Sequence, residues 1–553
     1  MTRAALQWSF SLTILTACIT ACGTQFSESD RAGSLGPDAE GVGRRDGGAA
    51  EGDGASSDAS DSAGFVDAPD CDATRSPAEA PCVLDEKYGV FVSASLGVDG
   101  GDGSRTKPFR AISLGIAAAA KVKKHVYVCA ETYQESITLS NGVAMFGYFT
   151  CATGSSWAVG TTRAAVNLLN QDGVLAQDLT SRTRVENFYF KAPDATADGG
   201  SSFGMRAIRA SGLSLVNVAL LAGRGGVGKV GTAGVQPDQK TNIDGSIYAL
   251  GAICASCNPA PDSCPTYGDC TSKRAAKAGG VSTCFMPGTS TALPTLNGGA
   301  GGTGGAPAIF RTDCTGTCAV KAVLAADSGG GATTQTSSGG TISGGLAVAG
   351  ADGSSGADGK DGANIGTFSE AYLAADGTHG GDATPGQGGG GGAASNSHAT
   401  AINYLVADTQ LSSNSLWLGP TGSSGGAGGC AGSGGTGGGG GGASVALLVI
   451  DGAVHIETSE LTASAGGAAG EGKGGGQGTA GGKGASGWSS AGSGAAGGKG
   501  GAGGKGGHGG GGPSIGIVYR GAAPTVTSTT ISPGLGGDSK TNIGMVAKTY
   551  QQK

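Results

Sequence analysis

Aromatic and charged residues are scarce in this chain. Aromatic side chains make up 5% and charged side chains 14% of its 553 residues, whereas typical soluble domains carry about 25% charged residues. Proline numbers 18 against 114 glycines, which excludes a collagen composition because collagen is rich in both. The net charge of −7 argues against a nucleic-acid binder, since phosphate binding needs clustered lysine and arginine. A large conventional core therefore cannot extend over the whole chain.

Beyond the N-terminus, the sequence has no apolar run long enough to span a membrane. At the N-terminus, an arginine, a short apolar run and small residues follow one another as in an export signal. Two stretches, LTAC and ITAC, end at Cys18 and Cys22 and resemble the bacterial lipobox, whose cysteine becomes the lipidated first residue. Gly23 and a polar run follow the second stretch. We therefore expect residues 1–22 to be a lipoprotein signal peptide with Cys22 as the lipidated residue and Cys18 as the alternative. The resemblance implies an outer-membrane or cell-surface lipoprotein, and a periplasmic or secreted protein is the alternative.

The chain has fourteen cysteines, of which twelve are left when the two lipobox cysteines are set aside. An even number in an exported protein predicts disulfides, because that compartment is oxidising. The candidates are Cys71, Cys82, Cys129, Cys151, Cys254, Cys257, Cys264, Cys270, Cys284, Cys314, Cys318 and Cys430. The Cys254–Cys257 spacing with two further cysteines could also suit zinc. No second C-x-x-C follows, so we favour disulfides and expect no metal there.

Glycine, aspartate, alanine and serine dominate the residues that follow the lipobox. Residues 23–70 have almost no large apolar side chains, so they cannot offset the entropy cost of ordering. We expect a disordered acidic tether over 23–87 that separates the folded part from the membrane.

Residues 88–150 carry the first regular pattern. Four short stretches have the apolar character of strands: 90–95, 126–130, 136–139 and 143–149. Phe109, Ile112 and Ile116 recur at helical spacing, which predicts a helix over 108–124. Turns are expected at 131–133 and at 141–142.

This block resembles the opening of right-handed parallel β-helix proteins of the pectin-lyase-like superfamily. It is specifically similar to a short domain of unknown function found at the start of many such proteins. The matching residues are Asp99, Gly101 to Gly103, Lys107 to Phe109, Ile112, Tyr127, Val128, Tyr133, Glu135, Ile137, Leu139, Gly142, Val143, Gly147 and Tyr148. The resemblance implies that 88–150 form the N-terminal cap and first coils, with the helix closing the apolar end of the solenoid. Ala130-Glu131-Thr132 departs from the family, which has Pro-Gly ahead of the tyrosine.

A repeat emerges after residue 150. Four stretches each have an apolar strand, a turn, a second and a third short strand, and then a glycine run: 207–226, 402–426, 447–467 and 517–537. Coils of a parallel β-helix are built in this way. The expected fold class is therefore all-β, a right-handed parallel β-helix with an N-terminal capping helix. Residues 151–550 would supply its coils, with glycine-rich and cysteine-rich insertions leaving the same corner of successive coils.

One glycine run is strictly phased. Residues 496–512 read AGGKGGAGGKGGHGGGG, and the residues other than glycine fall at every third position. A left-handed extended helix has three residues per turn, so these residues would share one face and leave bare backbone elsewhere. Neighbouring strands could then share hydrogen bonds, as in polyglycine II. A flexible loop is the alternative, also for the less regular runs 329–345, 386–392 and 425–442; the composition resembles glycine-rich PE/PGRS-type repeat proteins.

Motifs with chemical meaning are incomplete. Residues 223–230 nearly match a P-loop but lack its hydroxyl, and two GxSxG matches at 200–204 and 422–426 lack the strand–turn–helix context. His508 lies in a GHG that resembles pectin-degrading hydrolases, but the paired carboxylates of glycoside cleavage are missing. We therefore expect no catalytic residues and no nucleotide.

Acidic residues are the candidates for a cofactor, and Asp99 with Asp102 forms a second, similar group. Asp352, Asp358 and Asp361 lie among glycines, where Asp/Gly turns could supply the oxygens that Ca²⁺ needs. Lys360 lies inside the group, so ordinary solvated turns are the competing interpretation, and otherwise we expect no cofactor and no metal.

These patterns predict an exported surface protein with a structural, adhesive or binding role and no catalysis. The expected partners are the membrane, through a lipid anchor, and cell-surface or extracellular polysaccharide or other surface proteins, but no nucleic acid. The alternative is a polysaccharide-active enzyme, a lyase or a hydrolase.

Overall fold

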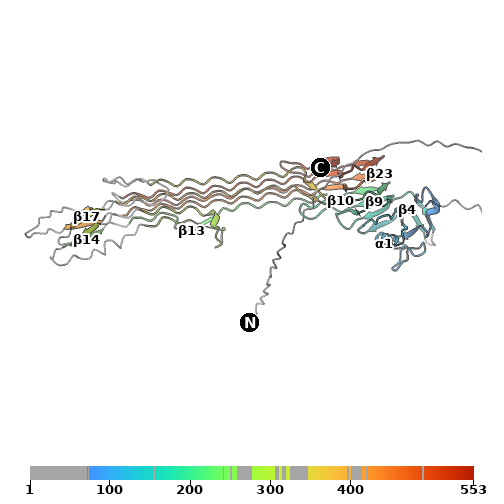
Figure 1. Cartoon of the computed structure of the whole chain (residues 1–553), viewed down its shortest axis with the longest axis horizontal. Helices are drawn as coiled ribbons and strands as arrows, with labels where there is room; N and C mark the ends of the chain where they lie inside the picture. Colours follow the sequence, from blue (N-terminus) through green and yellow to red (C-terminus); the bar gives the residue numbers. More distant parts are fainter. Residues whose placement is uncertain are drawn as a thin grey trace, which may run out of the picture. The chain divides into compact units, whose positions relative to one another are not determined.

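The computed structural model describes residues 71–553 except for 73, 153–155, 241, 249–251, 258–276, 305–309, 314–318, 324–346, 395–397, 400–413, 419–420 and 488–490. The chain divides into two units, Met1–Ala68 and Pro69–Lys553, and all described residues belong to the second. Nearly all of its regular elements are β-strands (Figure 1). Its helices among the described residues are α1 (Ile112–Val122) and the short 3-10 helices η1 (Pro81–Val83) and η2 (Pro294–Leu296).

Three parallel sheets carry most of the strands. The first sheet has the order β1 (Gly89–Val92), β2 (His125–Cys129), β4 (Met145–Ala152), β8 (Thr183–Glu186), β11 (Leu213–Val216), β23 (His455–Glu457) and β26 (Thr525–Thr527), with β5 (Ser156–Val159) antiparallel to β4. The second sheet has the order β7 (Val174–Gln177), β10 (Ser202–Ile208), β22 (Ser444–Ile450), β25 (Ser514–Arg520) and β28 (Val546–Gln551). The third sheet has the order β3 (Thr132–Gln134), β6 (Ala164–Asn167), β9 (Phe188–Lys191), β12 (Ala219–Leu221), β24 (Glu460–Thr462) and β27 (Thr530–Ser532).

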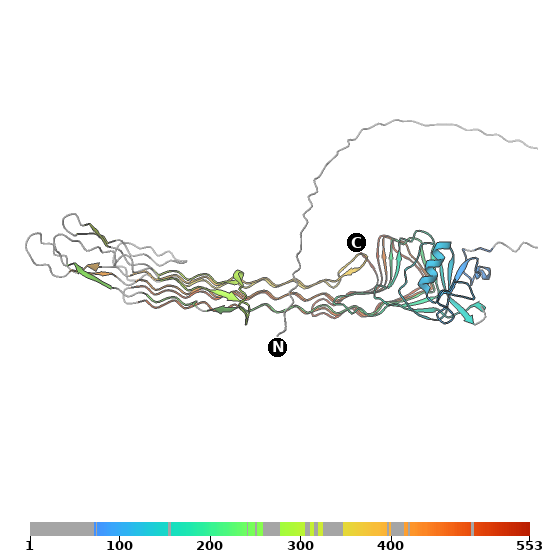
Figure 2. The same ribbon diagram turned by 90° about the horizontal axis from the view of Figure 1, so that it is seen from below.

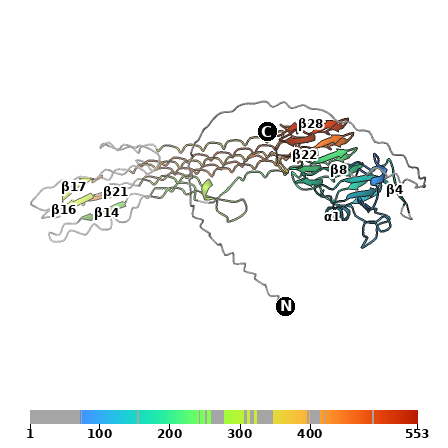
Figure 3. The same cartoon turned by 45° about the vertical axis from the view of Figure 1, so that its right-hand side comes forward.

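The chain visits the three sheets in turn, which is compatible with a parallel β-helix. One coil runs β10, β11 and β12, and the next two run β22 to β24 and β25 to β27. Although residues 222–443 separate β12 from β22 in sequence, β10 and β22 are adjacent and parallel. Figure 3 shows β22 in the same stack of strands as β28. The insertions after β12, β24 and β27 leave from strands of the third sheet and return at strands of the second.

The core lies between the three sheets. Inward side chains stack in register: Leu215 on β11 pairs with Val185 on β8 and with Ile456 on β23, and all three are fully buried. Such stacking follows from the alternation of side chains along each strand. Burial of each of these side chains stabilises the fold by about 1.5–3 kcal/mol.

The corners between sheets repeat a left-handed backbone conformation. Asn187 follows β8 with a φ of 62°, and Asn217 follows β11 with a φ of 51°. Asparagine tolerates this region better than most residues because its short side chain bonds locally. The amide of Asn217 donates to the Oδ1 of Asn187 one coil away, so the corners of successive coils are joined by side chains as well as by strands.

The helix α1 covers strands β1 and β2 of the first sheet (Figure 2). Its N-terminus is capped from a distance, because the Glu135 carboxylate accepts the backbone N–H groups of Ile112 (2.7 Å) and Ser113 (2.9 Å). A carboxylate at this position also opposes the positive end of the helix dipole. The helix predicted over 108–124 is thus present with narrower bounds.

Two local expectations for this region differ from the structure. Residues 136–139, expected as a strand, form only an isolated bridge between Thr138 and Leu175. The turn expected at 131–133 overlaps β3, because Tyr133 points inward and its hydroxyl donates to the Cys129 carbonyl at 3.2 Å.

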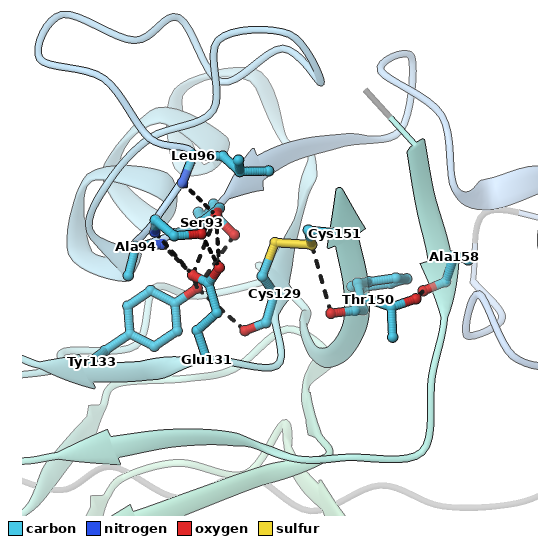
Figure 4. The surroundings of a disulfide bond; sticks show 12 residues. Ser93, Ala94, Leu96, Cys129, Glu131, Tyr133, Thr150, Cys151 and Ala158 are labelled. Carbon is cyan, nitrogen blue, oxygen red and sulfur yellow. Dashed lines mark hydrogen bonds between the residues drawn. A yellow bond between two sulfur atoms is a disulfide. The ribbon is translucent and has the colours of Figure 1, made fainter. Parts of the chain in front are cut away.

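A disulfide and a carboxylate fix the loop beside this strand (Figure 4). Cys129 and Cys151 are bonded, and the adjacent Glu131 carboxylate accepts the backbone N–H of Ala94 (2.5 Å) and the hydroxyl of Ser93 (3.1 Å). Glu131 thereby connects the end of β1 to the start of β3.

Residues 71–87, expected as part of the disordered tether, have a defined structure. The Cys71–Cys82 disulfide closes this segment, the Tyr127 hydroxyl donates to the Val83 carbonyl, and the Tyr148 hydroxyl accepts the Ala78 N–H at 3.1 Å. The predicted tether over 23–87 is therefore too long at its C-terminal end, because aromatic side chains on the outer face of the first sheet anchor these residues.

The remaining strands are antiparallel. The pairs are β13 (Asp238–Lys240) with β15 (Thr283–Phe285), β16 (Phe310–Asp313) with β17 (Ala319–Val323), β18 (Thr367–Phe368) with β19 (Tyr372–Leu373), and β21 (Asn414–Leu418) with both β14 (Ala252–Cys257) and β20 (His398–Ala399). The repeat predicted at 402–426 is therefore wrong as a coil. Its 402–413 part lies outside the described residues, and β21 pairs in an antiparallel sheet.

Extended segments rich in glycine run side by side from the three sheets toward β14 and β17 (Figures 1 and 2). We call these segments the glycine bundle: 223–235, 277–281, 298–304, 347–363, 374–394, 421–443, 465–487 and 491–513. Residues 421–443 are named the central segment.

Candidate functional site: the glycine bundle and its surface

Backbone hydrogen bonds with a period of three hold the glycine bundle together. In the central segment, the N–H groups of Gly426, Gly429 and Gly432 donate to carbonyls three residues apart in 491–513, at 2.9–3.0 Å. The N–H groups of Gly470 and Gly476 donate back to the central segment at 2.8 Å. Because successive residues point to different sides, each segment bonds to several neighbours at once, unlike a β-strand.

Close approach makes glycine necessary at the contact positions. A Cβ added to Gly432 would lie less than 3.0 Å from the Gly476 carbonyl oxygen, and one on Gly503 would lie as close to the Ser433 carbonyl oxygen. Real side chains do not tolerate such separations, and the tightly packed backbone has no room to move away. Glycine is therefore required at Gly432 and Gly503 because the backbones pack closely, and not because the backbone there needs the conformational freedom of glycine.

The central segment is enclosed by its neighbours. Residues 421–432 are buried, and the whole of 421–443 consists of glycine, serine, alanine, threonine and Cys430. The outer segment 347–363 is mostly exposed and carries aspartate and lysine. Side-chain size therefore follows position: the most enclosed segment has the smallest residues, although it lacks the strict phasing of 496–512.

Short polar side chains bind the N–H groups that face outward. Asp352, Asp358 and Asp361 each accept one backbone N–H, at 2.7 Å, from Lys499, Lys505 and His508 of the next segment. A hydrogen bond to a charged acceptor is worth about 1.5–3 kcal/mol when sheltered from water. The phased residues of 496–512 are thus aligned with a matching column of carboxylates.

These three aspartates were the calcium candidates. Each carboxylate is directed at a different N–H group along the segment. Within the described ranges, no group of three histidine, cysteine, aspartate or glutamate side chains could hold a metal ion. The aspartates join 347–363 to 491–513, and the backbone of Lys360 bonds Thr378 of 374–394.

A recess of about 230 Å³ lies where the bundle meets the C-terminal residues, and it is lined by Ala468, Ala469, Gly470, Glu471, His508, Asp538, Ser539 and Lys540. Glu471 pairs with Lys540 (2.5 Å) and Lys473 (3.0 Å). Hydrogen bonds from these two ammonium groups lower the pKa of Glu471 to about 2. The His508 Nδ1 accepts the Gly472 N–H at 3.3 Å, so in the neutral ring the proton lies on Nε2. The two lysines satisfy Glu471, and Asp538 is the other carboxylate of the recess.

The structure shows disulfide bonds for six of the twelve candidate cysteines. Cys71–Cys82, Cys129–Cys151 and Cys284–Cys430 are bonded. The last pair is buried beside Leu296 and Ala383 and joins β15 to the central segment. Cys254 and Cys257 lie on β14, and the other candidates lie outside the described residues: Cys264, Cys270, Cys314 and Cys318, together with the lipobox cysteines Cys18 and Cys22.

The sequence motifs without context have structural roles. Residues 223–230, the near P-loop, are extended, and Gly225 and Gly228 donate to carbonyls of 465–487. The two GxSxG matches lie at the start of β10 and in the central segment. His508 of the GHG motif occupies a phased position, as predicted from its spacing.

Sequence reasoning missed a second column of polar acceptors. Asp376, His379 and Asp382 accept the N–H groups of Gly440, Gly437 and Gly434 at 2.7–3.1 Å. The sequence pattern D-x-x-H-x-x-D over residues 376–382 could have revealed this column, because it has the same period of three. The glycines around it do not recur at every third position, so the pattern did not stand out.

Comparison with known proteins returned no match: no family model, no curated protein and no solved structure is similar to this chain. In the described part of the chain, none of the helices is both long and apolar enough to cross a membrane.

Proposed function

We propose that this chain is an exported, lipid-anchored bacterial surface protein with a structural, adhesive or binding role and no catalysis. In this proposal a right-handed parallel β-helix, capped by α1, carries a stiff rod of polyglycine-II helices. A disordered tether joins it to Cys22 in the outer membrane, and the rod presents the antiparallel strands at its far end to partners such as surface polysaccharide or other surface proteins.

The observation that carries the proposal is the enclosed central segment. Its period-three hydrogen bonds and obligatory glycines are the features of polyglycine II, in which left-handed extended chains rise by about 3.1 Å per residue. Residues 421–443 would then span about 70 Å. A long element built from backbone contacts supports a spacer or a display role, because it gains length with few apolar side chains.

The pairing of charged groups at the recess also supports a binding role. Glu471 is ion-paired with Lys540 and Lys473, and the aspartates of the bundle accept backbone N–H groups. Glycoside cleavage would need two carboxylates facing a substrate, and of the two that line this recess, Glu471 and Asp538, the first is bound by two lysines.

Anchoring and catalysis are tested together in a bacterium with an outer membrane. Wild type should incorporate radiolabelled palmitate and fractionate with the outer membrane, Cys22→Ser should lose both properties, and Cys18→Ser should keep them. The purified folded part, residues 71–553, should retain polysaccharides without releasing reducing ends or unsaturated products. Clear product release that is lost on mutation of a carboxylate cluster would overturn the binding role, and a soluble, unlabelled wild type would overturn the anchor.

A further inference from the structure

In several columns of the glycine bundle, side chains of a neighbouring segment bind the N–H groups that face outward. Asp352 accepts the N–H of Lys499, and Thr384 accepts that of Ser354, both at 2.7 Å. A sheltered backbone N–H without an acceptor costs free energy, and short polar residues at every third position avoid that cost. A column without such acceptors is therefore a candidate binding site, because a ligand can supply them.

One column of 465–487 lacks acceptors over most of its length. At one end, the His508 Nδ1 accepts the Gly472 N–H at 3.3 Å. At the other end, the Ser493 hydroxyl accepts the Gly487 N–H at 2.8 Å. The members in between recur at every third residue, and their N–H groups donate to no residue that the structure describes: Gly475, Gly478, Gly481 and Gly484. The second of these residues is nevertheless buried.

The residues opposite this column have no acceptor atoms in their side chains. By the same period of three, the positions of 491–513 between Ser493 and His508 are Ala496, Lys499, Ala502 and Lys505. An ammonium group donates hydrogen bonds but cannot accept them, and a methyl group does neither. The strict phase of 496–512 therefore places lysine and alanine where other columns have an acceptor.

Backbone carbonyls lie beside the free N–H groups. A Cβ on any of the first three free glycines would come within 2.1–2.2 Å of a carbonyl oxygen of 491–513, that of Gly503, Gly500 or Gly497. None of these oxygens accepts a hydrogen bond from a residue that the structure describes. We define the lysine face as the four free N–H groups, these three carbonyls, and the exposed side chains of Lys499 and Lys505.

The chain itself covers the continuation of this face near the sheets. There the Gly537 N–H donates to the Gly512 carbonyl at 2.8 Å, and the Asp538 carbonyl accepts the Ala469 N–H at 2.7 Å. The recess of about 230 Å³ that His508 lines lies where this cover ends. The lysine face therefore begins at a recess, and beyond it both donors and acceptors are left for a ligand.

We propose that the lysine face binds a linear acidic polysaccharide. Whereas Glu471 of the recess is held by two lysines, Lys499 and Lys505 form no ion pair with any residue that the structure describes, so both ammonium groups are available to carboxylates. The free N–H groups donate to oxygens of the ligand, and the free carbonyls accept from its hydroxyl groups. The inference rests on the proposed binding role and deepens it, since it names the site and the chemical class of the ligand.

The period of the face suits a polymer rather than a single small anion. In a helix with three residues per turn, the free N–H groups recur about every 9 Å, and the two ammonium groups are about 19 Å apart. One carboxylate reaches one lysine, whereas a chain of carboxylates engages both and gains from their linkage. A nucleic acid is also a linear polyanion, but the net charge of −7 opposes it, and the hydroxyl-rich chain of a polysaccharide matches the carbonyl acceptors better.

Fluorescence anisotropy with labelled oligomers of alginate, a polymer of sugar acids, tests the site on the intact chain in nonionic detergent. Binding should saturate and should weaken with added salt, because exposed charges are screened. A neutral dextran oligomer of equal length should bind at least about tenfold more weakly. Lys499→Gln with Lys505→Gln should weaken alginate binding at least about tenfold. The matched control, Lys229→Gln with Lys360→Gln, removes two exposed lysines of other segments and should change binding less than about twofold.

A second variant tests the free N–H groups. Ala502→Asp places a carboxylate opposite Gly478, in the way that Asp358 stands opposite the Lys505 N–H. The new carboxylate should accept that N–H and repel alginate, so binding should fall at least about tenfold. Circular dichroism and hydrogen exchange of the central segment should match wild type, which shows that the variant is folded.

Four results would overturn the inference. They are the absence of saturable alginate binding, equal losses in the two lysine double variants, unchanged binding to Ala502→Asp, and tighter binding of an oligothymidylate that the Lys499→Gln/Lys505→Gln variant abolishes. The last outcome would assign the face to a nucleic acid. Retention of polysaccharide that is insensitive to all these variants would keep the proposed binding role and place it elsewhere, whereas loss of retention by wild type would contradict that role itself.

Discussion

The three-sheet region and the glycine bundle are stabilised by different parts of the polypeptide. In the sheets, large apolar side chains such as Leu215 and Ile456 stack inward, and the strands meet only at their edges. In the bundle, backbones contact one another on several sides, and no enclosed side chain of the central segment is larger than threonine. The same chain is therefore ordered in the sheets by the packing of large side chains, and in the bundle by close contact between backbones whose side chains are small or missing.

Truncation of a core side chain should have the largest effect and should act on the sheets. Leu215→Ala leaves a cavity between Val185 and Ile456, which costs about 2–5 kcal/mol of unfolding free energy. Urea unfolding of residues 71–553 followed by circular dichroism measures it. Ser214→Ala on the opposite face of β11 is the control and should change stability by less than about 0.5 kcal/mol; equal effects would contradict an inward core at Leu215.

Addition of one methyl group should have the next largest effect and should act on the bundle. Gly432→Ala forces the Cβ against the Gly476 carbonyl, which costs about 1–3 kcal/mol by overpacking. Alanine would otherwise stabilise the chain slightly through its unfolded state, so the sign of the change is diagnostic. Ala502→Ser, on an outward position, should be neutral within about 0.5 kcal/mol, and a neutral or stabilising Gly432→Ala would show that the segments are not in contact.

Removal of one polar acceptor should have a smaller effect. Asp358→Ala leaves the Lys505 N–H without its partner and should cost about 1 kcal/mol, whereas Asp358→Asn keeps an acceptor oxygen and should cost less. Denaturant unfolding of the two variants side by side measures the difference. The carboxylate would have another role, such as calcium binding, if asparagine were as harmful as alanine and added Ca²⁺ raised the stability of wild type alone.

Acid should produce the smallest effect, at the exposed Glu471. The two lysines depress the pKa of its carboxyl from 4.5 to about 2 in the folded state, so the unfolded state binds the proton first as the pH falls. The ion pairs therefore stabilise the fold above pH 4.5, and this contribution is lost between that value and about 2. Thermal unfolding at pH 7 and pH 3 should show a smaller pH dependence for Glu471→Gln than for wild type; identical dependences would mean that the pairs do not form.

Much of this contrast was predictable from residue patterns, because both regions follow short periods. A recurring order of three short strands followed by a glycine run predicted coils at 207–226, 447–467 and 517–537. The phase of 496–512 predicted one face for Lys499 and Lys505. The coil at 402–426 was wrong because its apolar run pairs with β14, and no local pattern distinguishes an antiparallel partner from a coil.

The position of the central segment was harder to predict. A segment surrounded on all sides needs small residues everywhere, so it loses the phase that marks an outer segment such as 496–512. The second column of polar acceptors was missed for a related reason: whether Asp376, His379 and Asp382 face solvent or a neighbouring N–H depends on which segments pack together, and the local sequence does not determine that.

Hydrogen exchange measured by mass spectrometry on residues 71–553 tests the central claim most directly. If the bundle is an ordered array of backbone-bonded segments, the N–H groups of 421–443 should exchange as slowly as those of β22, although they carry almost no apolar side chains. Exchange of 421–443 within seconds, at the rate of an unstructured glycine peptide, while β22 stays protected, would contradict it.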